Sequence, residues 1–315
     1  MSNPILNPVA KTHSEDSFSE YEVALSNRNS GTLLESLKHD ITPVGAHYLL
    51  NHFDVPFVDE STHWQLKFHG CFEQPYNIDF TSLKALPEIT QRVTLECAGN
   101  GRRLVTPHWP SQPWGHEAVG TADWTGVRLH QLLEKAGIDG QCKNIVFHGT
   151  DIGVDGGTVH NFARSLSVEQ ALHPDVMLAY AMNGQPLAPQ HGFPLRLIVP
   201  GWYGMASVKW LSEIEAIDHD FQGHQQVGTY VYRDHPTDTG EPVSLIRIRS
   251  LFVPPGIPDW STRKRLLRPG TTKIVGRAWC GGGQPVAKVE LGIDDHWTEA
   301  TLSPSVDPYL SLIHI

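Results

Sequence analysis

Glycine and proline recur so often in this chain that only short helices and strands fit between them. The 315 residues include 28 glycines and 23 prolines, which interrupt regular structure because glycine is conformationally free and proline lacks a backbone N–H. Both stay below the level of low-complexity sequence. Hydrophobic residues make up 40% of the chain and charged residues only 18%, so enough apolar surface is present to form a core. The sequence predicts a globular protein with mixed structure and long loops.

The regular elements that the residue pattern supports are short and intermixed. A helix is predicted at 129–136, LHQLLEKA, because its leucines share one face and Gly137 follows as a stop. A second helix is predicted at 167–172, with Ser167 as its N-cap. Strands are predicted at 64–68, 92–95, 144–148 and 194–199. Because helices and strands mix without a strict βαβ alternation, the predicted fold class is α+β.

Three regions of the chain differ in composition and residue pattern. Residues 1–40 are polar and unpatterned, which predicts an N-terminal arm. Residues 41–240 carry the mixed elements. Residues 241–315 are predicted to be all-β, with strands at 245–251, 273–279 and 286–293, like the start of an immunoglobulin-like sandwich. Such a domain needs about 100 residues, so this one is predicted to be incomplete, with a truncated or chimeric end where 310–315 leave the pattern.

Charge and motif counts argue against several classes of protein. The net charge of −10 and the lack of a Lys/Arg block argue against a nucleic acid partner. No apolar stretch approaches the roughly 18 residues of a membrane span. No leader pattern is visible, so the expected location is cytoplasmic, or periplasmic if an export signal was lost. The four cysteines form no CxxC pair, and the 18 histidines contain no HExxH motif, which excludes zinc ribbons, covalent haem and HExxH zinc sites.

One cysteine stands in a context that core cysteines rarely have. The segment 93–103, VTLECAGNGRR, is a β-run that leads into Cys97 on a turn rich in glycine and asparagine, with two arginines after it. A turn beside fixed positive charge lowers the pKa of a thiol and makes its sulfur accessible. Cys97 is therefore predicted to be a nucleophile or a ligand of a soft metal.

The motif CAGN followed by arginine resembles the molybdenum-binding cysteine loop of the sulfite oxidase family. Three later segments resemble that family's next motifs in the same order. They are WGHEAVGTADWTGVRL at 114–129, LAYAMNGQPLAPQHGFPLRLIVPGWYG at 178–204, and SVKWL at 207–211. The resemblance extends from about residue 42 to 302. It implies a molybdopterin-binding domain followed by an immunoglobulin-like dimerisation domain, a molybdenum–molybdopterin cofactor, and Cys97 as the protein ligand of the metal.

The resemblance also implies which residues meet the cofactor and the substrate. Arg196 and Lys209 would neutralise the cofactor phosphate. Arg102, with Arg103 as its competitor, would bind the substrate anion beside Trp114 in the pocket. Tyr230 resembles the active-site tyrosine, with Tyr232 left as an alternative. The full set implied for the cofactor is Asn51, His52, Asp151, His191, Arg196, Ser207 and Lys209.

Two departures from the family pattern bear on substrate choice. Animal and plant sulfite oxidases have an arginine before Asn-His, where this chain has Leu50. The later motif usually reads Arg-His-Val-Lys, where this chain has Ala206-Ser207-Val208-Lys209. The segment HYLLNHFDVP (47–56) is more similar to bacterial sulfite dehydrogenase-like and sulfane dehydrogenase-like members than to animal and plant sulfite oxidases.

The implied activity is oxygen-atom transfer to or from a small sulfur oxyanion, with oxidation of sulfite to sulfate as the first expectation. The chain contains no haem or flavin motif, so a separate electron acceptor such as a cytochrome is expected. A homodimer is expected if the C-terminal domain is complete. Two alternatives are an S-oxide, N-oxide or nitrate reductase on the same cofactor, and an interaction protein without cofactor.

Overall fold

The computed structural model describes residues 18–58, 64–107, 109–235, 237–283, 285–303 and 310–314. These residues pack into two compact units. The first unit contains the chain up to Leu50, the segment Gly99–Thr121 and the chain from Arg247 onward, and the second contains Asn51–Ala98 and Ala122–Ile246. The units are defined by packing and not by chain order, so the domain boundaries at residues 40 and 240 remain predictions. No helix of the described residues is long and apolar enough to cross a membrane.

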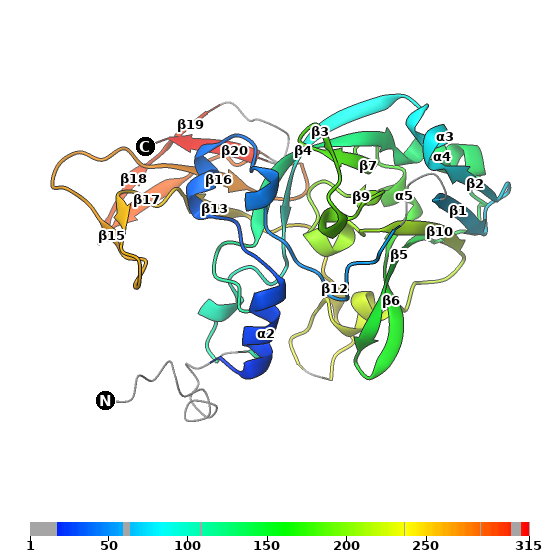
Figure 1. Ribbon diagram of the computed structural model, residues 1–315, viewed down its shortest axis with the longest axis horizontal. Coiled ribbons are helices and arrows are strands. Elements are labelled where there is room, and N and C mark those ends of the chain that lie inside the picture. Colours follow the sequence, from blue (N-terminus) through cyan, green and yellow to red (C-terminus); the bar gives the residue numbers. More distant parts are fainter. Residues whose placement is uncertain are drawn as a thin grey trace. The chain divides into compact units, whose positions relative to one another are not determined.

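A mixed sheet in the second unit has the strand order β2-β1-β10-β5-β6 (Figure 1). Strand β1 pairs parallel with β10, whereas the other neighbours are antiparallel. Leu66, Phe68, Phe147 and Ile214 are fully buried along its inner face, as expected for strands whose side chains alternate between core and solvent. The strands are β1 (Gln65–Gly70), β2 (Tyr76–Asp79), β5 (Asn144–Asp155), β6 (Thr158–Ser167) and β10 (Leu211–Ile217).

A second sheet follows the order β3-β4-β7-β8, with β9 also paired to β7. Its strands are β3 (Glu88–Glu96), β4 (Val119–Arg128), β7 (Met177–Met182), β8 (Gln185–Pro186) and β9 (Arg196–Ile198). Three short helices accompany the sheets, namely α3 (Phe80–Lys84), α4 (Leu129–Ala136) and α5 (Val168–Ala171). Gly137 ends α4 at φ +65°, and Ser167 caps α5. Both predicted helices and the α+β class are therefore confirmed.

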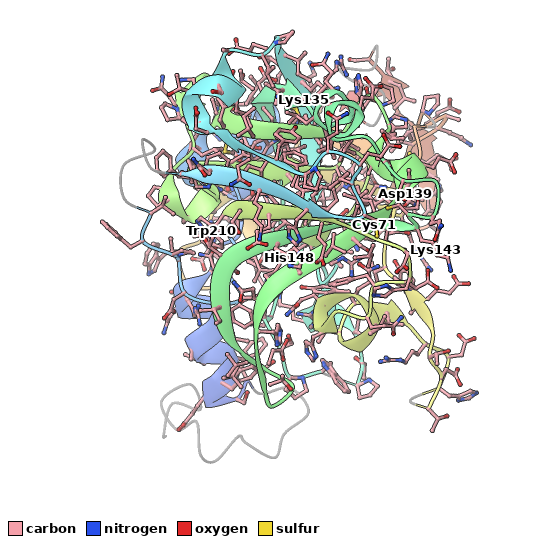
Figure 2. The ribbon with its side chains drawn as sticks, turned by 90° about the vertical axis from the view of Figure 1, so that its right-hand side faces the viewer. Cys71, Lys135, Asp139, Lys143, His148 and Trp210 are labelled. Carbon is pink, nitrogen blue, oxygen red and sulfur yellow. The ribbon has the colours of Figure 1, made fainter. Side chains whose placement is uncertain are left out.

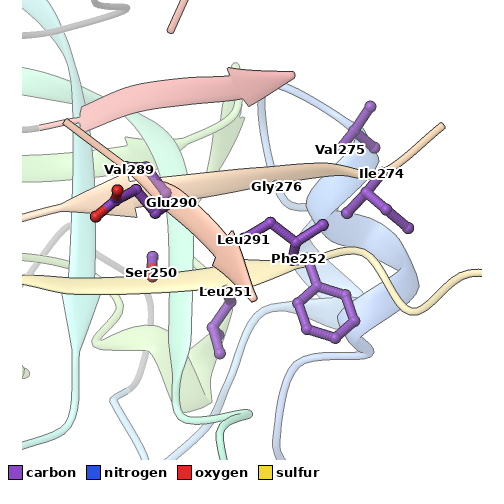
Figure 3. A pocket seen from close by; sticks show the side chains of 9 residues that line it. All are labelled: Ser250, Leu251, Phe252, Ile274, Val275, Gly276, Val289, Glu290 and Leu291. Atoms are coloured by element: carbon purple, nitrogen blue, oxygen red, sulfur yellow. The ribbon is translucent and has the colours of Figure 1, made fainter. Parts of the chain in front are cut away.

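The first unit is mainly β-structure from Arg247 onward. One sheet has the order β13-β16-β20-β19, and two hairpins, β14–β15 and β17–β18, accompany it. A small hollow of about 80 Å³ lies against β13, β16 and β17 and is lined largely by apolar side chains (Figure 3). The strands are β13 (Arg249–Phe252), β14 (Ile257–Pro258), β15 (Arg265–Leu266), β16 (Val275–Trp279), β17 (Glu290–Ile293), β18 (His296–Glu299), β19 (Thr301–Leu302) and β20 (Leu310–His314).

Two segments of the first unit differ from their sequence patterns. Strand β20 pairs antiparallel with β16, although its residues were predicted to leave the β pattern. The polar N-terminal region contains helix α2 (Glu20–Arg28), followed by the single turns η1 (Leu34–Lys38) and η2 (Val44–Ala46). A capping box between Ser19 and Glu22 starts α2, and such local hydrogen bonds stabilise a helix start that has no apolar stripe.

Candidate active site

Arg196 links two loops of the second unit that the sequence assigned to the cofactor. It begins β9 and is 5% exposed. Its Nη1 donates to the backbone oxygen of His191 (3.0 Å) and its Nη2 to that of Ser207 (3.1 Å). The guanidinium also lies over the ring of Trp124, 4.8 Å from its centroid. Three of the predicted cofactor residues therefore lie together, held by hydrogen bonds that fix the arginine plane.

Lys209 lies beside this arginine. Its Nζ donates to the backbone oxygen of Gln190 (3.1 Å) and to Asn51 Oδ1, and lies 4.4 Å from the ring centroid of Trp210, which is labelled in Figure 2. Burial and then the like charge of Arg196 hold the pKa of Lys209 well below its usual value. An anion placed against the two cations would relieve this repulsion and restore the charge of Lys209.

Asp151 completes the group of residues with a carboxyl that is almost fully buried. Burial raises its pKa to about 6, and the charge of Lys209 opposes this shift in part. Its Oδ1 has no hydrogen-bond partner among the described residues. A buried polar atom without a partner costs about 1–3 kcal/mol, so this oxygen is available to a bound group.

Glycines make room around these side chains. A Cβ at Gly149 would lie 2.5 Å from Asp151 Oδ1 and 2.8 Å from the backbone oxygen of Lys209. Gly192 has φ +105°, and a Cβ there would lie 3.1–3.2 Å from the side chains of Lys209 and Arg196. Two adjacent cations, an unpartnered carboxyl oxygen and glycine backbone fit a buried phosphate attached to a polar ring. The residues present therefore fit the molybdopterin that the resemblance implies.

His52 and Tyr230 form a second feature of the same unit. His52 Nε2 lies 2.6 Å from the Tyr230 hydroxyl, and the two rings meet edge to face. The His52 ring also packs on Phe162, with 5.0 Å between ring centroids. Tyr232, two residues later on β11 (Val231–Tyr232), is exposed. The structure brings Tyr230 to a predicted cofactor residue, which favours it over Tyr232.

Cys97 directly follows the last residue of β3, and the turn 98–101 comes after it. Cys97 is only 6% exposed, and Val93 and Leu95 of β3 are also buried. All four cysteines are thiols. Among the described residues, no group of three or more His, Cys, Asp or Glu side chains could hold a metal ion. The role of Cys97 as the metal ligand remains a prediction.

Arg102, Arg103 and Trp114 belong to the first unit. Arg102 lies on the short turn η4 (Arg102–Leu104), where its Nη1 donates to Ser111 Oγ and to the backbone oxygen of Gln112, both at 3.1 Å. Arg103 is exposed, whereas Trp114 is 3% exposed. The indole Nε1 of Trp114 is buried without a hydrogen-bond partner in the part of the chain that the structure describes. Arg102 is thus held in one orientation and Arg103 is open to solvent.

Arg164, a buried arginine on β6 that interacts electrostatically with Tyr230, was not among the predicted site residues. Its neighbours on the same face are Phe162 and Leu166, and all three are at most 6% exposed. A charged residue between two apolar ones on the buried face of a strand is a visible signal, because strand side chains alternate with period two. The segment FARSL (162–166) could therefore have indicated a buried arginine.

The raised pKa of Asp151 predicts a pH dependence of stability in the cofactor-free protein. Asp151 keeps a proton up to pH about 6 when folded but only to about 3.9 when unfolded. This contribution to stability is complete at low pH and is lost as the pH rises through about 6. Asp151→Asn should remove the dependence and stabilise the protein at pH 7 by about 2–3 kcal/mol. Urea unfolding of both proteins between pH 4 and 7 measures this, and parallel stability curves would contradict it.

Comparisons with known proteins identify the family of this chain. The family model named oxidoreductase molybdopterin binding domain matches residues 52–225, more than half of the chain. The NAD(P)H nitrate reductase of Hordeum vulgare is 33% identical over 278 residues, which cover 81% of this chain and 30% of the relative. The mitochondrial sulfite oxidase of Drosophila melanogaster is 32% identical over 279 residues, which cover 85% of this chain and 48% of the relative. The chain thus spans about a third to a half of the length of these relatives.

A solved structure extends the likeness to the fold. The crystal structure of the sulfane dehydrogenase SoxCD from Paracoccus pantotrophus matches with a TM-score of 0.75 and 25% identity, over 90% of this chain and 70% of that chain. The match includes the C-terminal β-structure as well as the mixed unit. The family implies a molybdenum–molybdopterin cofactor, in agreement with the cations, carboxyl and glycines described above. The chain therefore belongs to the sulfite oxidase family of molybdopterin-dependent oxidoreductases.

Proposed function

We propose that this chain oxidises a small sulfur oxyanion, with sulfite converted to sulfate, and passes the electrons to a separate acceptor such as a cytochrome. One observation carries the proposal. The Tyr230 hydroxyl is hydrogen-bonded to His52, and the preceding residue, Asn51, accepts a hydrogen bond from Lys209 in the cation group. A phenol and an imidazole therefore stand at the edge of the region that fits the cofactor.

The residues divide into those that hold the cofactor and those that handle the substrate. Arg196 and Lys209 would hold the phosphate, and Cys97 would hold the metal. When bound, the molybdenum cofactor supplies a two-electron redox centre. Sulfite gains one oxygen atom derived from water, while two protons and two electrons leave. When His52 Nε2 carries a proton and donates it to the phenol oxygen, the single O–H of Tyr230 is available to donate a hydrogen bond to an oxyanion.

The experiment that tests the proposal measures the cofactor and two activities on the same preparation. Molybdenum and pterin content are determined on the full chain, followed by sulfite oxidation with a one-electron acceptor and nitrate reduction with a reduced dye. We expect about one molybdenum per chain and faster turnover with sulfite than with nitrate. A preparation that contains molybdenum and reduces nitrate without oxidising sulfite would overturn the proposal.

Nitrate reduction is the second candidate because a nitrate reductase is as similar to the chain as a sulfite oxidase is, at 33% and 32% identity. Leu50 also favours a less charged substrate, since it stands where eukaryotic sulfite oxidases have an arginine.

The C-terminal β-structure would support a homodimer, as the resemblance implies.

Leu50→Arg is expected to strengthen sulfite binding. A charge-assisted hydrogen bond to an oxyanion contributes about 1.5–3 kcal/mol, or roughly ten- to a hundredfold in affinity. The measurement is the ratio of kcat/KM for sulfite to that for a neutral sulfur donor, in the wild type and in the variant. Leu49→Arg is the control, because it adds the same charge one residue away. An unchanged ratio would mean that Leu50 does not set specificity.

A further inference from the structure

Arg164 is a buried cation that the proposed reaction does not use. It is 2% exposed on β6, and no ion pair joins it to a carboxylate of the described residues. Removing a charge from water without an opposite charge is costly, so such an arginine needs compensation from other polar groups. Its Nε is buried with no hydrogen-bond partner in the described parts of the chain.

The guanidinium is instead bound to two backbone carbonyls that bracket Tyr230. Nη1 donates to the oxygen of Gln225 (2.6 Å), in the short helical turn η7 (His224–Gly228), and Nη2 donates to the oxygen of Val243 (2.9 Å). Val243 in turn donates its N–H to the backbone oxygen of Tyr230 (2.9 Å). Strand β11 also pairs with β12 (Glu241–Pro242). Arg164 therefore links η7, which precedes Tyr230, to the end of the β11–β12 hairpin, which follows it, by one hydrogen bond to each.

The same strand supports the partner of Tyr230. Phe162, two residues before Arg164 and on the same face of β6, packs against the His52 ring. His52 holds the Tyr230 hydroxyl at 2.6 Å. One face of β6 thus supports both members of the His52–Tyr230 pair. Phe162 packs on the His52 ring, and Arg164 binds Val243, which donates to the backbone oxygen of Tyr230.

Charge adds to this mechanical link. Arg164 lies within electrostatic range of the Tyr230 phenol, and burial lowers the pKa of Arg164 to about 10, so the guanidinium stays charged at neutral pH. Arg164 from β6 and His52 from the loop before β1 are two titratable groups that interact with Tyr230. His224 on η7 is paired with Asp155 (3.0 Å). The phenol therefore interacts with a fixed positive charge as well as with an imidazole.

We propose that Arg164 is a positioning residue that holds the Tyr230 hydroxyl against His52 and keeps a positive charge beside it. This inference deepens the proposed function, in which Tyr230 faces the substrate. A phenol in this setting keeps one orientation, and negative charge that develops on its oxygen is stabilised.

The test compares Arg164→Gln, which removes the charge, with Arg164→Lys, which keeps it but offers one ammonium in place of two forked donors. The ionisation of Tyr230 is followed in the full-length holoprotein by alkaline ultraviolet difference absorbance. The titration of each protein is corrected by subtracting that of the same protein with Tyr230→Phe. The difference contains the signal of Tyr230 without that of the other tyrosines. We expect the Tyr230 titration to move upward by on the order of one pH unit in Arg164→Gln and to stay near wild type in Arg164→Lys.

The control is Arg277→Gln. Arg277 is 3% exposed and donates to the backbone oxygens of Leu37 and His39 in the first unit. It matches Arg164 in burial and in its carbonyl partners and differs in its ion pair with Asp40 (3.6 Å). We expect this control to lose stability without moving the Tyr230 titration. A Tyr230 titration that is unchanged in Arg164→Gln, or that moves equally in Arg277→Gln, would overturn the proposal.

Kinetics supply a second readout. Both Arg164 variants should lower kcat for sulfite by tenfold or more, and neither should lower it much further when Tyr230→Phe is already present, because the arginine acts through the tyrosine. Additive losses would overturn the proposal. If Arg164→Gln does not fold, Arg164→Lys carries the test, since it must lose kcat while the Tyr230 titration stays near wild type. The absorbance titration needs no turnover, so absence of sulfite oxidation in the wild type would overturn the proposed function alone.

Discussion

A chain in which Cys97 is replaced by serine is expected to fold and to lose more than a hundredfold of its oxidase activity. Serine is nearly the same size as cysteine, so the almost fully buried position at the end of β3 should still be filled. The chemistry differs, because a hydroxyl is a hard and weakly acidic donor whereas a thiolate is a soft one that suits a metal cycling between oxidation states. Even changes outside the ligand shell of a metal site cost ten- to a hundredfold.

The matched control for this prediction is Cys142→Ser. Cys142 is a half-buried thiol of the second unit whose Sγ lies 3.4 Å from the backbone oxygen of Asn144. Burial raises its pKa, so it stays a neutral thiol and its serine variant should keep full activity. Turnover with sulfite and molybdenum content are measured for both variants. Wild-type turnover in Cys97→Ser would show that another group holds the metal.

Loss of the cofactor is the expected result of replacing either Arg196 or Lys209. Arg196→Ala and Lys209→Ala should each lower cofactor occupancy more than they change substrate affinity, because a buried phosphate left without its cation costs several kcal/mol. Lys209→Ala is the cleaner change. Arg196 also holds the backbone at His191 and Ser207, so its removal should loosen both loops.

The measurement is molybdenum and pterin content per chain, followed by KM for sulfite in the fraction that remains loaded. Lys143→Ala serves as the control, since Lys143 is an exposed lysine of the same unit (labelled in Figure 2). It should keep wild-type occupancy. If Lys209→Ala kept full occupancy and showed only a raised KM, the lysine would face the substrate and not the phosphate.

Much of the local structure was predictable because its causes are local. The leucines of α4, its terminal Gly137 and the Ser167 cap of α5 each act within one or two turns of their own helix. Helix α2 was not predicted, because a capping box starts it and its one buried residue is Glu22, so the apolar stripe from which helices are recognised in sequence is absent. Strand β20 was not predicted either, because it is stabilised by pairing with β16, about 35 residues earlier in the chain.

Choices between neighbouring residues needed the tertiary structure. Tyr230 and Tyr232 are two residues apart and carry the same side chain, so residue type could not separate them. The hydrogen bond to His52, 178 residues away in sequence, does so. Arg102 and Arg103 also carry the same side chain, and they are distinguished by the hydrogen bonds that the Arg102 guanidinium donates to Ser111 and Gln112.

The sequence by itself determined the family and the cofactor and supplied the candidate site residues, because the cysteine loop and the three later motifs resemble those of the family and follow in the same order. The tertiary structure decided which of those residues meet. Lys209 reaches Asn51 across 158 residues of sequence, and Arg164 reaches the backbone on both sides of Tyr230. Such contacts depend on the register of strands and on burial that is shared between distant segments, and no short stretch of sequence specifies either of them.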